Sequence, residues 1–272
     1  TVTHRGGTVG AGIAVTTGPA GTVTIEDLGI VDTGSRVDAT GIAVVGGAGT
    51  TRIDVGSASE AGAVTGDAAA FGIDVSGIEG TAEVRVVEGS TIDVPTGAAI
   101  RVRGAPESSA VTVLAEGDLA GNSGVSVTAD RATLTTASLQ VTEDVAWIGG
   151  TTDTGLAVEA EADVIRWTGL AGLQVISDAT AGVDRAAVSL TGPGGGYAER
   201  IDVALELLDG TSSFAATGPL LSGLHLEADT IDGDLLLSAL TVLGSGPNPI
   251  RGIDAFATES YRLRVGSLVV PM

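Results

Sequence analysis

Hydrophobic positions fall into a short phrase that recurs along the whole chain. Each copy reads as a small residue, an aliphatic residue, a variable residue and a second aliphatic residue. The copies are Gly12–Val15, Gly41–Val44, Gly72–Val75, Ala99–Val102, Gly124–Val127, Gly155–Val158, Ala187–Leu190, Gly223–Leu226 and Gly252–Ala255. Successive copies begin between 25 and 36 residues apart. A self-similar unit of about this length is the signature of a stacked repeat architecture.

A second apolar pattern follows each phrase after a Gly-rich or polar corner. It alternates apolar and polar residues with a period of two, as in Val23–Ile25, Ile53–Val55, Val84–Val86, Ile201–Leu205 and Leu263–Val265. Each unit is therefore expected to hold two or three strands of two to five residues, with no α-helix beyond a turn or two. Strands this short do not suit a β-sandwich, where they usually span about 5 or 6 residues.

Stacked coils remove that difficulty, because each strand then pairs in parallel with its equivalent in the coils above and below. The pattern predicts an all-β parallel β-helix, or β-solenoid, of about nine coils of ~30 residues, forming a single domain over residues 1–272. Alternate side chains of a strand face opposite sides. We expect Ile42, Ile73, Val125, Leu156 and Leu224 to lie inward in one ladder, while Asp74, Arg101 and His225 point outward.

The small residue that opens each phrase has two interpretations. A sharp corner with positive φ favours glycine, whereas a close-packed corner accepts glycine or alanine. Because Ala99 and Ala187 take this place in two copies, both interpretations stay open.

The longest spacing, between Ala187 and Gly223, predicts an inserted bulge over Gly192–Gly218. Solenoids tolerate insertions at their corners and often carry specificity there. The candidate binding residues of this segment are Pro193, Tyr197 and Phe214.

Composition narrows the classes of function. The hydrophobic fraction of 43% supports a folded core, and 42 glycines with only 3% aromatic residues fit an all-β chain with many corners. The formal charge is −21, from 34 acidic residues against 13 basic ones. So acidic a surface disfavours nucleic acid and anionic membranes. The lack of cysteine excludes disulfides, thiolate metal sites and cysteine nucleophiles. No apolar run approaches the ~18 residues of a membrane span.

The phrase of small, aliphatic, variable and aliphatic residues at ~30-residue spacing resembles the right-handed parallel β-helix superfamily. This pectin-lyase-like group includes pectate lyases, phage tailspikes and bacterial surface or autotransporter-passenger proteins. The resemblance covers nearly the whole chain and implies a right-handed coil, but it specifies architecture and hardly any activity. It implies an extracellular or cell-surface location in a bacterium. Because the sequence begins at Thr1 and stops at Pro271 and Met272 without cap-like polar ends, we expect the chain to be part of a longer secreted or surface protein.

Catalytic side chains are expected in the outward column, which is formed by the variable residue of each phrase. That column reads Ala14, Ala43, Asp74, Arg101, Ser126, Ala157, Ser189, His225 and Asp254. No two carboxylates are neighbours in it, so the paired acids of a glycosidase are absent from this face. His225 beside Asp254 has two interpretations, a polarised general base or a surface pair. Asp74 beside Arg101 is interpreted as an exposed ion pair contributing about 0 to 1 kcal/mol.

Acidic clusters offer a candidate metal site. Asp229, Asp232 and Asp234 supply oxygen ligands for Ca²⁺, although the segment lacks the EF-hand spacing and its terminal Glu. A solvated acidic turn is the alternative, and no other cofactor is expected. Trp147 and Trp167 lie in successive coils and form either a core ladder or an exposed sugar-binding platform.

Two classes of function follow. The first is a non-catalytic extracellular structural or adhesive module, which presents loops to a cell-surface glycan or protein partner. The second is a polysaccharide-acting lyase or hydrolase on the same fold. A homo-oligomer stays open, whereas nucleic acid and direct membrane insertion are not expected as partners.

Overall fold

The computed structural model describes residues 2–3, 11–36, 39–142, 158–178, 186–207, 212–218, 222–244, 251–266 and 268–269. These segments form β-strands joined by turns, with one 3-10 turn at Pro193–Gly195 and no α-helix among them. The expectation of an all-β chain is therefore confirmed for this part of the sequence.

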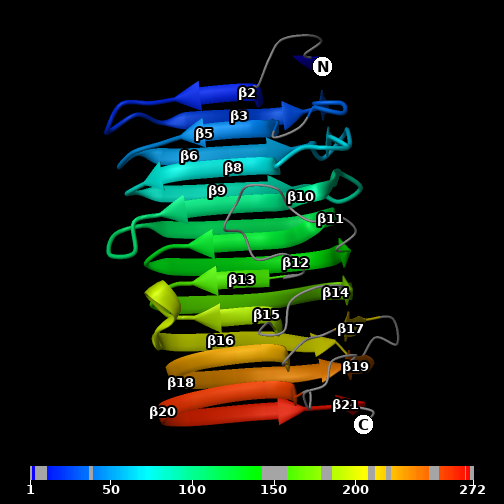
Figure 1. The fold of residues 1–272 in the computed structure, drawn as a ribbon. Coiled ribbons are helices and arrows are strands. Elements are labelled where there is room, and N and C mark those ends of the chain that lie inside the picture. The colour runs from blue at the N-terminus through cyan, green and yellow to red at the C-terminus, as the bar shows by residue number, and fades with distance from the viewer. Residues whose placement is uncertain are drawn as a thin grey trace.

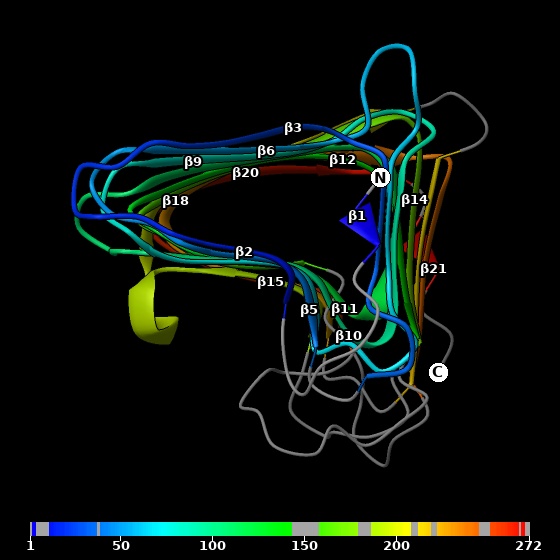
Figure 2. The ribbon, with the colours of Figure 1, turned by 90° about the horizontal axis from the view of Figure 1, so that it is seen from above.

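The chain winds into a parallel β-solenoid whose coils follow one another from the N-terminal to the C-terminal end (Figure 1). Seen from the N-terminal end, it runs clockwise as it recedes from the viewer, so the solenoid is right-handed (Figure 2). Every pairing between the strands of the described segments is parallel.

Three stacks of strands make up the wall. The first stack contains β2 (Ala11–Thr16), β5 (Thr40–Val45), β8 (Phe71–Ile78), the ends of β10 (Thr91–Gly104) and β11 (Ala110–Thr128), β13 (Val158–Glu161), β15 (Ala186–Thr191), and the beginnings of β18 (Ser222–Leu237) and β20 (Arg251–Val265). It carries the recurring phrase. Nine strand segments lie in this stack within the described residues, in agreement with the nine copies in the sequence.

The second stack contains β3 (Val23–Leu28), β6 (Thr50–Val55), β9 (Thr81–Val86), the beginnings of β11, β12 (Arg131–Thr142) and β14 (Val164–Asp178), β16 (Ala198–Leu207), and the ends of β18 and β20. The third contains β1 (Val2–Thr3), β4 (Ile30–Asp32), β7 (Ala63–Thr65), further parts of β10, β11, β12 and β14, β17 (Ser213–Gly218), β19 (Ala239–Gly244) and β21 (Leu268–Val269). Viewed along the rod, the first two stacks face each other and are joined by corners at the left of Figure 2. The third stack lies across the opposite side of the rod, at the right (Figure 2).

The prediction that strands span two to five residues is wrong for much of the rod. β11 has 19 residues, β18 has 16, and β14 and β20 have 15 each. These strands bend from one stack into the next, and the pairing register shifts at the bends, as between Val94 and Ala98 or between Ala115 and Asp118. The strands therefore continue through corners that the sequence pattern assigns to breaks, with a local irregularity at each of these two corners.

The inward ladder of the first stack follows the predicted register in eight of its nine coils. Ile42, Ile73 and Ile100 are each 0% exposed and stack directly upon one another. The exception is the coil after Val125, where Val158 takes the ladder position predicted for Leu156. Leu156 itself lies outside the described residues. Alternation continues through this segment, so a slip of two residues keeps the same face inward and sequence pattern cannot choose between the two registers.

That slip also changes one outward residue. Glu159, and not Ala157, follows Ser126 and precedes Ser189 in the outward column. The remaining column members are as predicted, with Asp74 beside Arg101 and His225 beside Asp254.

Close packing explains the glycines that open the phrases. A Cβ added to Gly72 would lie 2.4 Å from Ile92 Cγ2 and 2.6 Å from the Ala99 carbonyl oxygen. A Cβ added to Gly41 would lie 2.4 Å from Val64 Cγ1 and 2.6 Å from the Gly72 carbonyl oxygen. Neither glycine has a positive φ. Of the two interpretations, the close-packed corner is therefore correct at these positions.

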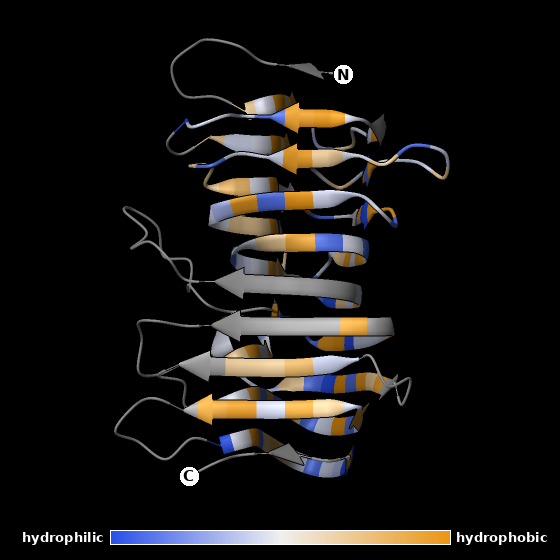
Figure 3. Cartoon of the chain, turned by 90° about the vertical axis from the view of Figure 1, so that its right-hand side faces the viewer, coloured by the Kyte–Doolittle hydropathy of each residue, from blue (hydrophilic) through white to orange (hydrophobic). Residues whose placement is uncertain are grey.

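The interior is filled by aliphatic ladders, and among the described residues Trp167 is the largest side chain fully enclosed there. Apolar and polar residues alternate along many of the strands in Figure 3, as a wall with one dry face requires. In the described part of the chain there is no helix of a length and hydropathy that could cross a membrane.

Candidate functional site

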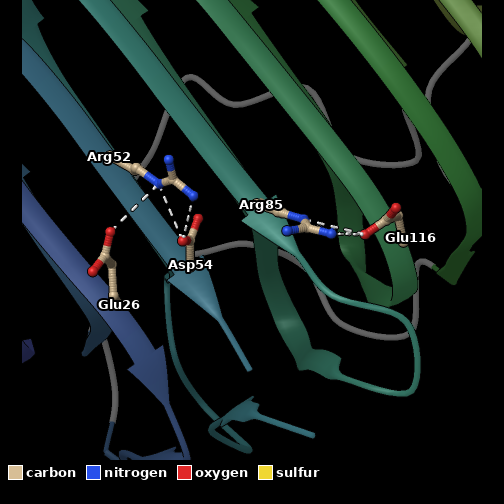
Figure 4. Close-up of polar contacts among 5 residues, drawn as sticks. All are labelled: Glu26, Arg52, Asp54, Arg85 and Glu116. Carbon is tan, nitrogen blue, oxygen red and sulfur yellow. Dashed lines mark hydrogen bonds and ion pairs between the residues drawn. The ribbon is translucent and has the colours of Figure 1, made fainter. Parts of the chain in front are cut away.

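Parallel stacking places the outward side chains of neighbouring coils side by side, so charged residues about 30 positions apart in sequence meet on the surface. Arg52 donates to Asp54 Oδ2 from Nε and Nη2, at 3.1 and 2.9 Å, and its Nε lies 3.8 Å from Glu26 Oε1 (Figure 4). Arg85 donates in the same forked manner to Glu116 Oε2, at 3.2 and 2.8 Å (Figure 4). Similar pairs recur down to the last coil, so arginine neutralises selected carboxylates along the rod.

The pair formed by Asp74 and Arg101 is more enclosed than a surface ion pair. Arg101 donates from Nε and Nη2 to the two carboxylate oxygens, at 2.9 and 2.8 Å. The side chains are only 16% and 18% exposed. The Arg101 guanidinium carbon also lies 3.5 Å from the centroid of the Phe71 ring. These contacts suit a structural clamp between coils.

His225 lies in a small polar and aromatic group on β18 and β20. Its Nε2 is 3.5 Å from Glu227 Oε2, and its Nδ1 is 3.8 Å from Asp254 Oδ2. The Phe256 ring meets the imidazole edge to face, with centroids 6.2 Å apart. Asp254 is also held by Arg251, at 2.8 Å.

This group supplies a base but not a complete nucleophilic site. Ser189 is the register neighbour of His225 on the preceding coil. Among the contacts of the described residues, however, no hydrogen bond joins its hydroxyl to the imidazole. His225 Nε2 is instead directed to Glu227. The geometry therefore favours the surface-pair interpretation of His225 and Asp254 over that of a general base.

Sequence reasoning missed two members of this group, Glu227 and Phe256. They occupy the outward position two residues after His225 and Asp254, on the same strands. A second outward column, read two residues further along each phrase, would have found them because the period of a strand is two.

The candidate calcium ligands face arginine or hydroxyl partners. Arg262 Nη2 lies 2.5 Å from Asp232 Oδ1, and Arg264 Nη2 donates to Asp234 Oδ2 at 2.7 Å. Asp229 accepts a hydrogen bond from the Thr258 hydroxyl. Because Arg264 donates hydrogen bonds to it, Asp234 has a pKa below the usual value of that carboxyl.

Calcium binds to several oxygen ligands at once. Asp232 and Asp234 each have an arginine at the oxygens that an ion would take. Within the described segments, no three or more His, Cys, Asp or Glu side chains are grouped so that they could hold a metal ion. Calcium at Asp229, Asp232 and Asp234 stays a prediction, and the arginine contacts favour the alternative of an ion-paired acidic strand.

The insertion is smaller than predicted. Residues 192–197 form a turn that projects from the corner between β15 and β16 (Figures 1 and 2). The Gly192 amide donates to the Gly196 oxygen at 2.6 Å, and Gly194 and Gly195 have φ of 68° and 74°. Tyr197 is 47% exposed. Pro193 and Tyr197 are therefore placed on an accessible turn, as expected.

Phe214 does not belong to that turn, which corrects the third candidate. It lies in β17, stacked between Val175 and Leu240, and is 2% exposed. The chain returns to regular strands at Ala198, so most of the predicted bulge is wall. Phe214 fills the interior and cannot contact a partner on the surface.

The two tryptophans are also separated. Trp167 is 0% exposed, stacks on Leu134, and donates from Nε1 to Thr136 Oγ1 at 3.0 Å. It belongs to the core and not to a sugar-binding platform. Trp147 lies outside the described residues.

Comparison of this chain with protein-family models, with curated proteins and with solved structures finds no match in any of the three. The fold is thus established by the structure, while membership of the pectin-lyase-like superfamily is not. Function has to be argued from the geometry of the rod and its surface.

Proposed function

We propose that this protein is a non-catalytic scaffold of an extracellular or cell-surface protein in a bacterium, in which the rod sets a fixed distance and presents turns from its corners. The observation that carries this proposal is the unbroken ladder of the first stack, which continues through every coil with the same inward positions. At a coil spacing of ~4.8 Å, nine coils give a rod of roughly 43 Å.

The outward surface supports the same proposal. Several of its arginines are engaged with carboxylates, as in the pairs of Arg101 with Asp74 and Arg85 with Glu116. Such interlocked pairs brace neighbouring coils. The proposal includes a relationship to the pectin-lyase-like β-helix superfamily, which contains surface, passenger and tailspike proteins.

In this proposal, a turn that projects from the rod binds the adhesion partner. The turn of residues 192–197 is the natural candidate, because Tyr197 combines an aromatic face with a hydroxyl on an accessible projection. The partner in this proposal is a cell-surface glycan or protein.

The competing function, a polysaccharide-acting lyase or hydrolase, is tested by turnover. The chain is incubated with acidic polysaccharides, with and without added Ca²⁺, and the release of unsaturated or reducing ends is measured. The scaffold proposal expects no release above a heat-denatured control. Release that disappears in His225→Ala, but persists in Thr112→Ala on an exposed part of β11, would overturn it.

Adhesion is tested separately on the turn. Tyr197→Ala is compared with Tyr261→Ala, which removes an exposed ring elsewhere, in binding to immobilised cell-surface glycans. The proposal expects loss of retention in the first variant alone. Equal retention of both variants at wild-type level would remove the turn as the adhesive element.

A further inference from the structure

Asp54 has a buried carboxylate oxygen that receives no hydrogen bond. The residue is 8% exposed, and its Oδ2 accepts from Arg52 Nε and Nη2 (Figure 4). Its Oδ1 has no partner among the described residues. A buried acceptor that lacks a donor is costly, and such atoms are rare in folded proteins. Asp54 Oδ1 is therefore a position at which a donor is expected.

The register of the second stack places an arginine beside Asp54. Arg85 follows Asp54 at the same position of the ladder, one coil further along the rod. The guanidinium of Arg85 is, however, turned to the coil after that, where Nε and Nη2 both donate to Glu116 Oε2 (Figure 4). Among the contacts of the described residues, Arg85 pairs with Glu116 and Asp54 pairs with Arg52, but not with each other.

Three other pairs in the rod show what this register relation produces elsewhere. In each, an aspartate is followed on the next coil by an arginine at the same position of the ladder, and the arginine contacts the aspartate directly. These pairs are Asp74 with Arg101, Asp232 with Arg262, and Asp234 with Arg264. Asp54 with Arg85 is the fourth such pair of the described strands and differs from the others in being open. The parallel pairing that lets the first three close is present here as well.

From this relation we infer that Arg85 is a two-position arm, which binds Glu116 in the present arrangement and turns back to Asp54 Oδ1 when Glu116 carries no charge. The first position joins β9 to β11, and the second joins β9 to β6. The arm thus moves an ion pair between coils by one step along the rod. Only side-chain torsions of Arg85 have to change, because Arg85 and Asp54 are already neighbours in the ladder.

Burial and charge favour the second position once the first is lost. Arg85 and Glu116 are 37% and 30% exposed, so their pair lies close to solvent. Without the Glu116 charge, Arg85 lacks a carboxylate and Asp54 Oδ1 lacks a donor, and bringing the two together satisfies both groups. The other charged groups of this cluster are Glu26 and Glu83, which lie around Arg52. Carboxylates therefore outnumber guanidiniums by four to two, and the arm stays in acidic surroundings at both positions.

A carboxylate that already holds one arginine can take a second, and Asp202 shows this in the same stack. Arg200, two residues earlier on the same strand, donates to its Oδ1 at 2.7 Å. Arg166, its register neighbour on the preceding coil, has Nε 3.5 Å from its Oδ2. Asp54 can likewise keep Arg52 at Oδ2 and receive Arg85 at Oδ1.

A crystal structure of Glu116→Ala is the direct test. We expect a guanidinium nitrogen of Arg85 at about 2.7–3.2 Å from Asp54 Oδ1. Glu88→Ala, which removes a carboxylate from an exposed corner after the same strand, is the matched control and should leave Arg85 at Glu116. The inference is overturned if Arg85 turns to solvent in Glu116→Ala, or if a water molecule or a cation takes its place at Asp54 Oδ1.

A double-mutant cycle gives the readout in solution. The coupling between Asp54→Asn and Arg85→Gln is measured by chemical denaturation, first in the natural chain and then with Glu116→Ala. We expect the coupling to change the unfolding equilibrium constant by less than about twofold in the natural chain and by about fivefold or more without Glu116. Variants are compared only after circular dichroism shows equal folding. Equal coupling in both backgrounds would contradict a two-position arm and would leave the scaffold proposal, which turnover and adhesion test, unaffected.

Discussion

Arg101 and Asp74 form a two-pronged ion pair between adjacent coils, and the guanidinium of Arg101 also covers the ring of Phe71. The three side chains come from β8 and β10 in the first stack. Arg264 makes a similar fork to Asp234, but its side chain is 48% exposed, whereas both partners of the Arg101–Asp74 pair are less than 20% exposed. It is the strongest candidate for a clamp that resists separation of two coils.

The clamp predicts that Arg101→Lys lowers the free energy of unfolding by about 1–2 kcal/mol, because lysine keeps the charge but cannot make the forked contact or stack on the ring in the same way. Chemical denaturation measures the change. Arg131→Lys is the control, since Arg131 is 70% exposed and lies 3.5 Å from Asp130, and its change should stay within about 0.5 kcal/mol. Equal losses in both variants would show that the clamp has no special role.

The inward register predicts a severe effect of Ile73→Asp. Its side chain is 0% exposed between Ile42 and Ile100, so an unpaired carboxylate there costs several kcal/mol or prevents folding. Thr112→Asp, at an exposed outward position of β11, should change stability by about 0.5 kcal/mol or less. Melting temperatures measured by circular dichroism separate the two. Similar melting temperatures would mean that the faces are assigned the wrong way round.

Close packing at the phrase glycines predicts that Gly72→Ala destabilises the protein by about 1–3 kcal/mol, because the new methyl group meets Ile92 and the Ala99 oxygen. Gly29→Ala is the matched control. Nothing lies within 4 Å of its added Cβ and its φ is not positive, so it should be neutral or stabilising by up to about 1 kcal/mol. Denaturation curves decide, and an equal effect of the two substitutions would argue against packing as the reason for glycine.

The contact of Arg264 with Asp234 predicts how the Asp234 carboxyl group titrates in acid. It holds the pKa of Asp234 below the usual value of about 3.9, so the stabilising contribution of this carboxylate is present above that value and is lost as the pH falls through the lowered folded-state pKa. Carboxyl carbon chemical shifts followed by NMR measure the titration. In Arg264→Gln the pKa of Asp234 should rise toward its usual value. An unchanged titration would show that the pair does not form in solution.

The sequence pattern was sufficient for most of the wall, and its failures have physical causes. Alternation identified the inward ladder through Ile73 and Leu224, but it could not choose between Leu156 and Val158, which share a face. It placed Phe214 on a bulge because spacing shows that a unit is long and not where the extra residues lie. In the structure residues 192–197 form a turn outside the strands, while Phe214 continues the third stack.

The surface groups were less accessible to sequence reasoning. Asp74 with Arg101 and His225 with Asp254 followed from the register of the phrase. The contribution of Phe71 to the first pair did not, because Phe71 precedes the phrase and contacts Arg101 on the next coil. The exposure of Tyr261 and Val265 also required coordinates, since their sequence pattern is the same as that of enclosed coils.

Deletion of one whole coil tests the central claim of a modular scaffold most directly. Removing residues 73–99, the 27 positions that separate Ile73 from its register partner Ile100, joins Gly72 to Ile100 and brings β6 onto β11. The account predicts a cooperatively folded β-protein whose rod, measured by small-angle X-ray scattering, is shorter by about 4.8 Å. Deletion of residues 73–86, which removes only part of that coil, should instead unfold the chain or broaden its melting. Unfolding of the whole-coil deletion, or an unchanged rod length, would contradict the account.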